Sequence, residues 1–139
     1  VLGSVLRAKQ EILKDAGLAS HAATQMCFDP ATIRDWLERE RDSGLEIPVH
    51  LGIPGAVERK KLLSVGARLG VGASLRYLQK NTGTLARMVM PGGYNPNKLL
   101  SPLAGDLQRL GIQGLHIFTF NQVDTTVAWR NDAISSLKS

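Results

Sequence analysis

Three strand-like runs that alternate with helix-like segments constrain this chain more than any other feature. The runs cover residues 20–27, 46–51 and 114–120, and each is largely apolar. Segments with the apolar spacing of helices separate them. Strands that alternate with helices are joined by right-handed crossovers and form a parallel sheet. The pattern therefore predicts an α/β protein whose three strands lie parallel, with both faces of the sheet covered.

Start and stop signals bound the first two helices. Apolar residues follow a helical spacing up to Gly17, a natural C-terminal stop. Asp29 and Pro30 are an N-cap and first-turn pair for the next helix, which we expect to end at Gly44.

The later segments give weaker signals. We expect a third helix over residues 57–69, irregular and mostly helical structure over 72–91, and a loop over 91–96. A leucine face over 99–110 predicts a helix that Pro102 restarts or kinks, and Gly111 closes it. Asp124 is expected to cap the last helix.

Thr24 and Gln25 interrupt the first strand with polar side chains. Burying an amide costs free energy unless the amide finds hydrogen-bond partners. Gln25 is therefore either a satisfied core amide or a residue facing a cavity in which a ligand supplies the partners. It lies near the carboxyl end of its strand, where the active sites of parallel α/β barrels are found.

The composition indicates one domain of ordinary character. The 139 residues include one cysteine, so no disulfide forms within the chain and a reducing cytoplasm fits. The net charge of +5 comes from Lys and Arg spread over the whole chain, which favours a solvated basic surface over a nucleic-acid site. No apolar run has the length, about 20 residues, that a membrane-spanning helix needs.

The residues that often carry chemistry show no motif spacing. The histidines, His21, His50 and His116, lack the close grouping of zinc ligands, so we predict no metal site and interpret the last two as barrel-lining residues. Cys27 is interpreted as a small buried hydrophobe. No catalytic residue is predicted.

A glycine-containing segment over residues 70–74 is favoured as a turn and helix cap. It lacks the lysine pattern of a P-loop and follows a helix instead of a strand. Phosphate capture by barrel loops is the alternative, with Arg76 and Lys80 close enough in sequence to help.

Three parallel strands leave two open sheet edges. We therefore expect these edges, and the apolar surface around Met88 and Phe118, to be buried against other protein. The expected partner is a missing part of a longer fold or another protein chain, and we expect a homo-oligomer.

Five segments together resemble the methylenetetrahydrofolate reductase family: TQMCFD, IPVHLGIPG, GASLRYLQKN, GGYNPNKLL and GLHIFTFNQ. The resemblance runs from about Lys14 to about Ala133, and the strand segments match the order and spacing of the family's sixth, seventh and eighth strands. It implies that residues 1–139 are the C-terminal part of a (β/α)8 TIM barrel, a fold of about 250 residues. It also implies that the missing N-terminal barrel half is the partner that covers the open edges.

The resemblance also implies an activity. The family is a group of flavoproteins that use FAD to move a hydride from NAD(P)H to methylenetetrahydrofolate, in one-carbon metabolism and methionine biosynthesis. The family's catalytic glutamate lies on the first barrel strand, outside this chain, so we expect these 139 residues alone to be inactive.

Site residues carry over position by position. Gln25 matches the strand-six glutamine that contacts folate, Ala23 matches a position that lines the flavin by its backbone, and Lys14 lies near a flavin-contacting lysine. Further positions match substrate-side residues of the family: Lys61 and Val65 after strand seven, and Phe118, Phe120 and Gln122 at the end of strand eight.

The chain departs from the family pattern at several of these positions. Lys61 and Val65 stand where the family often has glutamine and phenylalanine, and Gln122 stands where it often has arginine. Gln122 lacks the charge that pairs with a glutamate tail. The alternative is therefore a relative that binds a folate for methyl transfer or demethylation. A non-catalytic binding module is the third possibility.

Overall fold

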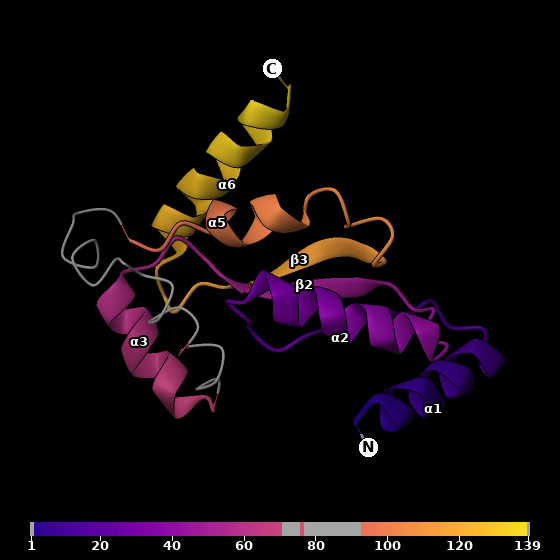
Figure 1. Cartoon of the computed structure of the whole chain (residues 1–139). Helices are drawn as coiled ribbons and strands as arrows, with labels where there is room; N and C mark the ends of the chain where they lie inside the picture. The colour runs from indigo at the N-terminus through magenta and orange to yellow at the C-terminus, as the bar shows by residue number, and fades with distance from the viewer. Residues whose placement is uncertain (1, 71–75, 77–92, 139) are drawn as a thin grey trace.

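The computed structural model describes residues 2–70, 76 and 93–138, and it is an α/β structure built on a parallel sheet (Figure 1). The strands are β1 (Ala22–Ala23), β2 (Val49–Pro54) and β3 (Ile112–Phe118), in the order β1-β2-β3. The helices are α1 (Leu2–Asp15), α2 (Pro30–Asp42), α3 (Arg59–Arg68), α5 (Asn97–Leu100), the 3-10 helix η2 (Ser101–Leu103) and α6 (Val123–Lys138). The predicted parallel arrangement is confirmed.

The strand register assigns residues to the two faces of the sheet. Leu51 pairs with Leu115 and Ile53 with Ile117, so these side chains share one face. The alternate residues share the other face, where three register pairs lie: His50 with Gly114, Gly52 with His116, and Pro54 with Phe118. A bulge lies between the first two register pairs of β2 and β3.

The main core lies on the first of these faces. Val49, Leu51 and Ile53 of β2 pack there against buried residues of α2 and of the α5–η2 segment: Ile33, Leu37, Leu99 and Leu103. Burying aliphatic side chains of this size contributes about 2 kcal/mol each. This cluster holds the sheet to the helices that Figure 1 shows running alongside it.

The other face, which we call the open face, differs from the prediction. His116 is exposed and His50 half-buried, and Ala23, which pairs with His50, is also exposed. Gly52 and Pro54 on the same face are buried, so the expectation that both faces are covered is wrong only for the part of this face around His50 and His116 in the described chain. Small and polar side chains make this part of the face compatible with solvent, whereas Val49, Leu51 and Ile53 of β2 are buried on the opposite face.

The strands begin and end at other residues than the sequence predicts. The first strand was predicted over 20–27, but only two residues pair in β1, because the chain bends over β2 after Ala23. The second strand starts later, at Val49, and continues to Pro54, so it includes part of the sequence expected to be a loop. The third strand starts and ends two residues earlier than expected.

The first two helices follow their sequence signals. The Asp29 side chain accepts a hydrogen bond from the Ala31 N–H at 3.0 Å, which confirms the N-cap. Gly17 and Gly44 adopt positive φ angles of 65° and 96°, which only glycine adopts without strain. The helix expected over 57–69 is α3, two residues shorter at its start.

The C-terminal half departs further. The leucine-rich segment does not form one helix: α5 gives way to η2 at Ser101, and turns follow to Gly111. Pro102 lies in η2, consistent with the expected break. The last helix begins at Val123, so Asp124 lies in its first turn and is not its cap. The expectations for 72–91 lie outside the described residues, except at position 76.

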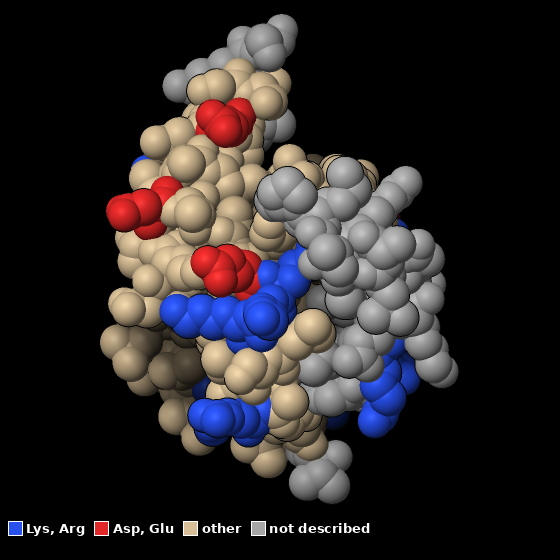
Figure 2. Space-filling view, turned by 90° about the vertical axis from the view of Figure 1, so that its left-hand side faces the viewer, with Lys and Arg blue, Asp and Glu red and all other residues tan. Residues whose placement is uncertain are grey.

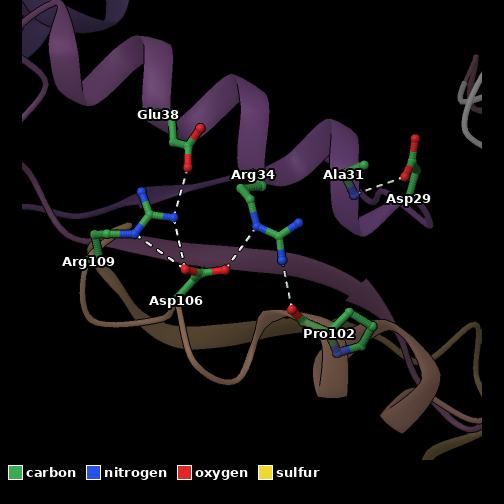
Figure 3. A network of polar contacts seen from close by, with 7 residues as sticks. All are labelled: Asp29, Ala31, Arg34, Glu38, Pro102, Asp106 and Arg109. Atoms are coloured by element: carbon green, nitrogen blue, oxygen red, sulfur yellow. Dashed lines mark hydrogen bonds and ion pairs between the residues drawn. The ribbon is translucent and has the colours of Figure 1, made fainter.

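Two arginines of α2 connect this helix to η2, to the turns before β3 and to the segment before β2. Arg34 pairs with Asp106 and also donates to the Pro102 carbonyl at 2.8 Å (Figure 3). Arg41 donates to carbonyls on both sides of it: Leu45 at 2.7 Å, Ile47 and Leu110 at 2.9 Å, and Gly111 at 3.3 Å. These contacts fix the amino ends of β2 and β3. In the described part of the chain, no helix has the length and apolar character needed to cross a membrane.

Candidate functional site

The carboxyl ends of the three strands lie along one edge of the sheet because the strands are parallel. Gln25 follows β1, Pro54 ends β2 and Phe118 ends β3. This arrangement brings together residues that are up to 93 positions apart, and it is the edge at which parallel α/β folds bind ligands.

The polar pair that interrupts the first strand divides into one structural residue and one exposed residue. The Thr24 hydroxyl oxygen accepts a hydrogen bond from the Gly52 N–H at 2.8 Å. Gln25 is exposed, and its Oε1 accepts from the Met26 N–H at 2.8 Å. The interpretation of Gln25 as a satisfied core amide is therefore wrong. Its amide nitrogen points to no acceptor among the described residues.

Gly52 allows the chain after β1 to lie directly against β2. A Cβ on Gly52 would overlap the Thr24 carbonyl oxygen and would come within 2.9 Å of the Gln25 carbonyl carbon and oxygen. Since these are backbone atoms, they have little freedom to move away. The absence of a side chain at Gly52 therefore determines where Gln25 is placed.

A cavity of about 400 Å³ opens beside β1, between α1 and α2. Its walls are mostly apolar and include Leu6, Ile33 and Trp36. Ala23, Thr24 and Gln25 line its sheet side. Cavities of about 300–1,000 Å³ with few polar groups are typical of small-molecule sites. Two of the residues predicted from the resemblance, Ala23 and Gln25, thus line the same cavity.

Lys14 lies elsewhere. It is near the end of α1, and its Nζ lies 3.6 Å from a carboxylate oxygen of Glu46, three residues before β2 begins. This position is at the amino ends of the strands, opposite Gln25. The lysine that lines the cavity is Lys9, which no motif in the sequence indicates. Its position at the cavity depends on how α1 packs against the rest of the chain.

The predicted residues at the end of β3 are partly structural. Phe118 and Phe120 pack against a second buried cluster that contains Met26, Phe28, Val57, Leu62 and Tyr94. Phe120 and Asn121 adopt positive φ angles of 49° and 64°, which are unusual for residues other than glycine. This sharp turn precedes α6 and lies at the candidate site.

Gln122 reaches the start of α3 across this turn. Its Oε1 accepts a hydrogen bond from the Glu58 N–H at 2.8 Å. The arginine that the family often has at this position carries only donors, so it could not accept a hydrogen bond from the Glu58 N–H. Lys61 and Val65 lie half-buried on α3, four residues apart and therefore on one side of the helix. The structure thus connects Gln122 to the start of α3. Lys61 and Val65 are not among the residues that line the cavity beside β1.

The histidines line the open face. His21 and His50 stack, with ring centroids 4.1 Å apart and planes 23° from parallel. His116 meets Phe118 edge to face, at 4.9 Å and 75°. In the described residues no three His, Cys, Asp or Glu side chains are grouped to hold a metal ion.

Cys27 is half-buried, and its Sγ lies 3.7 Å from the Asp29 carbonyl oxygen. It packs at the margin of the main core, as expected of a small hydrophobe. Burial raises the pKa of the Tyr94 hydroxyl well above its ordinary value, and the nearby Cys27 adds to the rise. Tyr94 is therefore neutral at physiological pH and belongs to the packed cluster.

One group of basic residues lies on α3. That helix contains Arg59, Lys60, Lys61 and Arg68, and no acidic residue. Figure 2 views the molecule from this side and shows Lys and Arg below most of the acidic side chains, which lie toward the C-terminal helix. The described surface therefore has both signs of charge on this face.

No protein-family model matches the chain.

Proposed function

We propose that the chain is the C-terminal part of a (β/α)8 barrel that binds a folate, and that it belongs to a flavin-dependent oxidoreductase resembling methylenetetrahydrofolate reductase. The observation that carries the proposal is the exposed Gln25 amide at the carboxyl end of β1. Its neighbours there are the ends of β2 and β3, as in a barrel mouth. The resemblance assigns the same residue to folate.

The chemistry of Gln25 suits a pterin. A glutamine amide offers donors and acceptors in one plane, and a pterin ring presents an amide-like edge. The Gln25 side chain is exposed, so ligand binding does not require it to leave a packed core. Its Oε1 contact with Met26 is local, and it can be exchanged for a contact with a ligand at low cost.

The residues present fit a flavin only in part. Ala23 is exposed beside the cavity, and a strand-edge backbone is suited to contact a ring. Lys14 pairs with Glu46 at the other end of the strands and does not fit a flavin at the mouth. A flavin, when bound, supplies the hydride-transfer chemistry. Gln25 would then orient the folate from the strand ends.

The partner in this proposal is the protein that continues the sheet. β1 and β3 are the edges of the described sheet, and Leu2, Val5 and Ile12 of α1 are exposed apolar residues. An apolar surface beside an unpaired strand edge is what a neighbouring strand and its helix cover. The remaining barrel strands would satisfy both edges.

A folate-binding relative that performs methyl transfer or demethylation is the second candidate. Gln122 favours it: the side chain that stands in place of the family's arginine is held by the Glu58 N–H and carries no charge. A glutamate tail therefore lacks its usual cation at this position. The two candidates share the folate and differ in whether flavin is needed.

The visible spectrum and a folate titration test the proposal in the full-length polypeptide. Flavin absorbance together with binding of 5-methyltetrahydrofolate supports the reductase. Folate binding by a colourless protein that does not take up added FAD supports the second candidate. Absence of folate binding, both with and without added FAD, contradicts both candidates.

A further inference from the structure

The acidic residues are unevenly distributed along this chain. Residues 59–105 contain eight Lys and Arg and no Asp or Glu, so the net charge of +5 arises from this segment alone. The remaining residues together carry a negative net charge. Because the segment holds no acid to balance its cations, the surface that it forms attracts anions.

Lys60 and Lys61 of α3 are the members of this group nearest the strand ends. Lys60 is exposed and Lys61 is half-buried. Glu58 directly precedes the helix, yet none of the ion pairs in the described part of the chain includes either lysine. Both ammonium groups can therefore pair with an anionic ligand without first breaking an ion pair within the chain.

The start of α3 lies at the carboxyl ends of the strands. The Gln122 side chain, which follows β3, accepts a hydrogen bond at 2.8 Å from the residue that precedes α3. Leu62, next to Lys61, is buried in the same cluster as Met26. Met26 directly follows Gln25, and both line the cavity beside β1. One buried cluster thus joins the start of α3 to the segment that carries the proposed folate contact.

We propose that Lys60 and Lys61 bind the glutamate carboxylates of the folate, and that they favour folates with several glutamates. The inference rests on the proposed function, because it names what holds the part of the ligand that lies outside the cavity. A folate carries its carboxylates at the end remote from the pterin ring, and each added glutamate contributes one more. Lysines are point charges on flexible stems, so they can pair with a flexible chain of carboxylates.

The position of the two lysines also complements the uncharged Gln122. Lys61 lies about one helical turn from Glu58, whose N–H binds the Gln122 side chain. A cation is therefore present close to position 122, although the residue at that position has no charge. The glutamate end of a folate that passes the turn after β3 meets this cation on α3.

The test compares 5-methyltetrahydrofolate carrying one glutamate with the same compound carrying three, by calorimetry on the full-length polypeptide at low ionic strength. The unsubstituted protein should bind the triglutamate about fivefold more tightly, since exposed ion pairs contribute modestly. Salt at about 0.5 M should remove this preference by screening. In Lys60→Gln/Lys61→Gln the preference should fall below about twofold. Arg68→Gln is the matched control, an exposed cation at the other end of α3, and it should keep the preference.

The outcomes separate the inference from the proposed function. A preference that persists in the double variant or at high salt overturns the inference and leaves the folate site standing, as does equal affinity of the unsubstituted protein for both ligands. An equal loss in Arg68→Gln also overturns it, because the effect then comes from the overall charge. Absence of binding of both ligands overturns the proposed function as well. Should the double variant fail to unfold cooperatively, Lys60→Gln alone should lower the preference by about half, and an unchanged preference there overturns the inference.

Discussion

The Arg34 Nε lies 2.9 Å from the Asp106 Oδ2, and this contact joins α2 to the loop before β3 across 72 positions of sequence. The other carboxylate oxygen of Asp106 pairs with Arg109 at 2.9 Å, and Arg109 in turn pairs with Glu38 at 2.8 Å (Figure 3). One carboxylate therefore accepts from two guanidinium groups. The network holds the turns that precede β3 against α2.

Asp106 should make stability depend on pH. Hydrogen bonds from Arg109 and then Arg34 lower the pKa of the Asp106 carboxyl below its ordinary value. A carboxyl with a lowered folded-state pKa contributes stability above its unfolded-state pKa, about 3.9, and this contribution is lost as pH falls through the folded-state pKa. The free energy of unfolding should therefore fall below pH of about 4. Urea unfolding of wild type and Asp106→Asn at several pH values checks this, because the substituted protein should show a smaller fall. If the free energy of unfolding falls equally with pH in both proteins, Asp106 does not contribute to the pH dependence.

Arg41→Met should destabilise the fold more than any single surface change on α2. Arg41 donates to four backbone carbonyls at the amino ends of two strands, and methionine leaves those carbonyls without this donor. We expect a loss of about 2–4 kcal/mol in the free energy of unfolding. Arg39→Met, an exposed position on the same helix, should change it by less than about 0.5 kcal/mol. Similar values for both variants in urea unfolding would contradict the role of Arg41.

Gly52→Ala should disturb the strand ends. The added methyl group overlaps backbone atoms of Thr24 and Gln25, and backbone cannot move away as a flexible side chain does. We expect a loss of about 1–3 kcal/mol from overpacking. Gly105→Ala is the matched control, because a Cβ at Gly105 meets nothing within 4 Å. Thermal unfolding compares the two, and a Gly52→Ala protein as stable as Gly105→Ala would show that the segment after β1 adapts.

The parallel sheet and the first two helices could be predicted because their signals are local or topological. Alternation of strands and helices requires crossovers, and crossovers produce parallel strands. Gly17 and Gly44 stop the helices by adopting left-handed conformations that side chains disfavour, and Asp29 caps by a bond within one turn. None of these depends on distant contacts.

The remaining features depend on distant contacts. β1 ends early because the Thr24 hydroxyl binds the Gly52 N–H, a partner 28 positions away. The open face was not foreseen, because a largely apolar run does not show which of its sides is covered. The left-handed turn at Phe120 and Asn121 carries no glycine, so its sequence gives no turn signal. Gln25 stands out in the sequence as a polar residue in an apolar run, but the run leaves two alternatives open, and only the resemblance assigns the residue to a ligand.

The chain of 139 residues alone should self-associate and should not turn over a folate. β3 is a seven-residue edge strand in the described sheet, and unpaired strand edges are templates for pairing with other chains. The resemblance places the family's catalytic glutamate on the first barrel strand, which these residues do not include. Light scattering of the purified chain and an assay with NADH, FAD and methylenetetrahydrofolate check both points. A monodisperse monomer would contradict the edge argument, and turnover would contradict the second.

Gln25→Ala separates a ligand role from a structural one in the full-length polypeptide. Gln25 is exposed and bonds only to the Met26 N–H through its side chain in the described structure, so its removal should change the free energy of unfolding by less than about 0.5 kcal/mol. Folate binding should weaken by about 1–3 kcal/mol, because the polar edge of the ring loses its partner.

Gln25→Glu adds a second comparison, since it keeps the size of the side chain but removes its donors at neutral pH. If the ligand needs a hydrogen-bond donor from residue 25, Gln25→Glu should weaken binding as much as Gln25→Ala does. If the ligand only donates to residue 25, Gln25→Glu should keep the affinity of the unsubstituted protein. Calorimetry and thermal unfolding on the same preparations measure affinity and stability together. A lowered melting temperature with unchanged affinity would remove Gln25 from the site, and the proposed folate site would then lack its central contact.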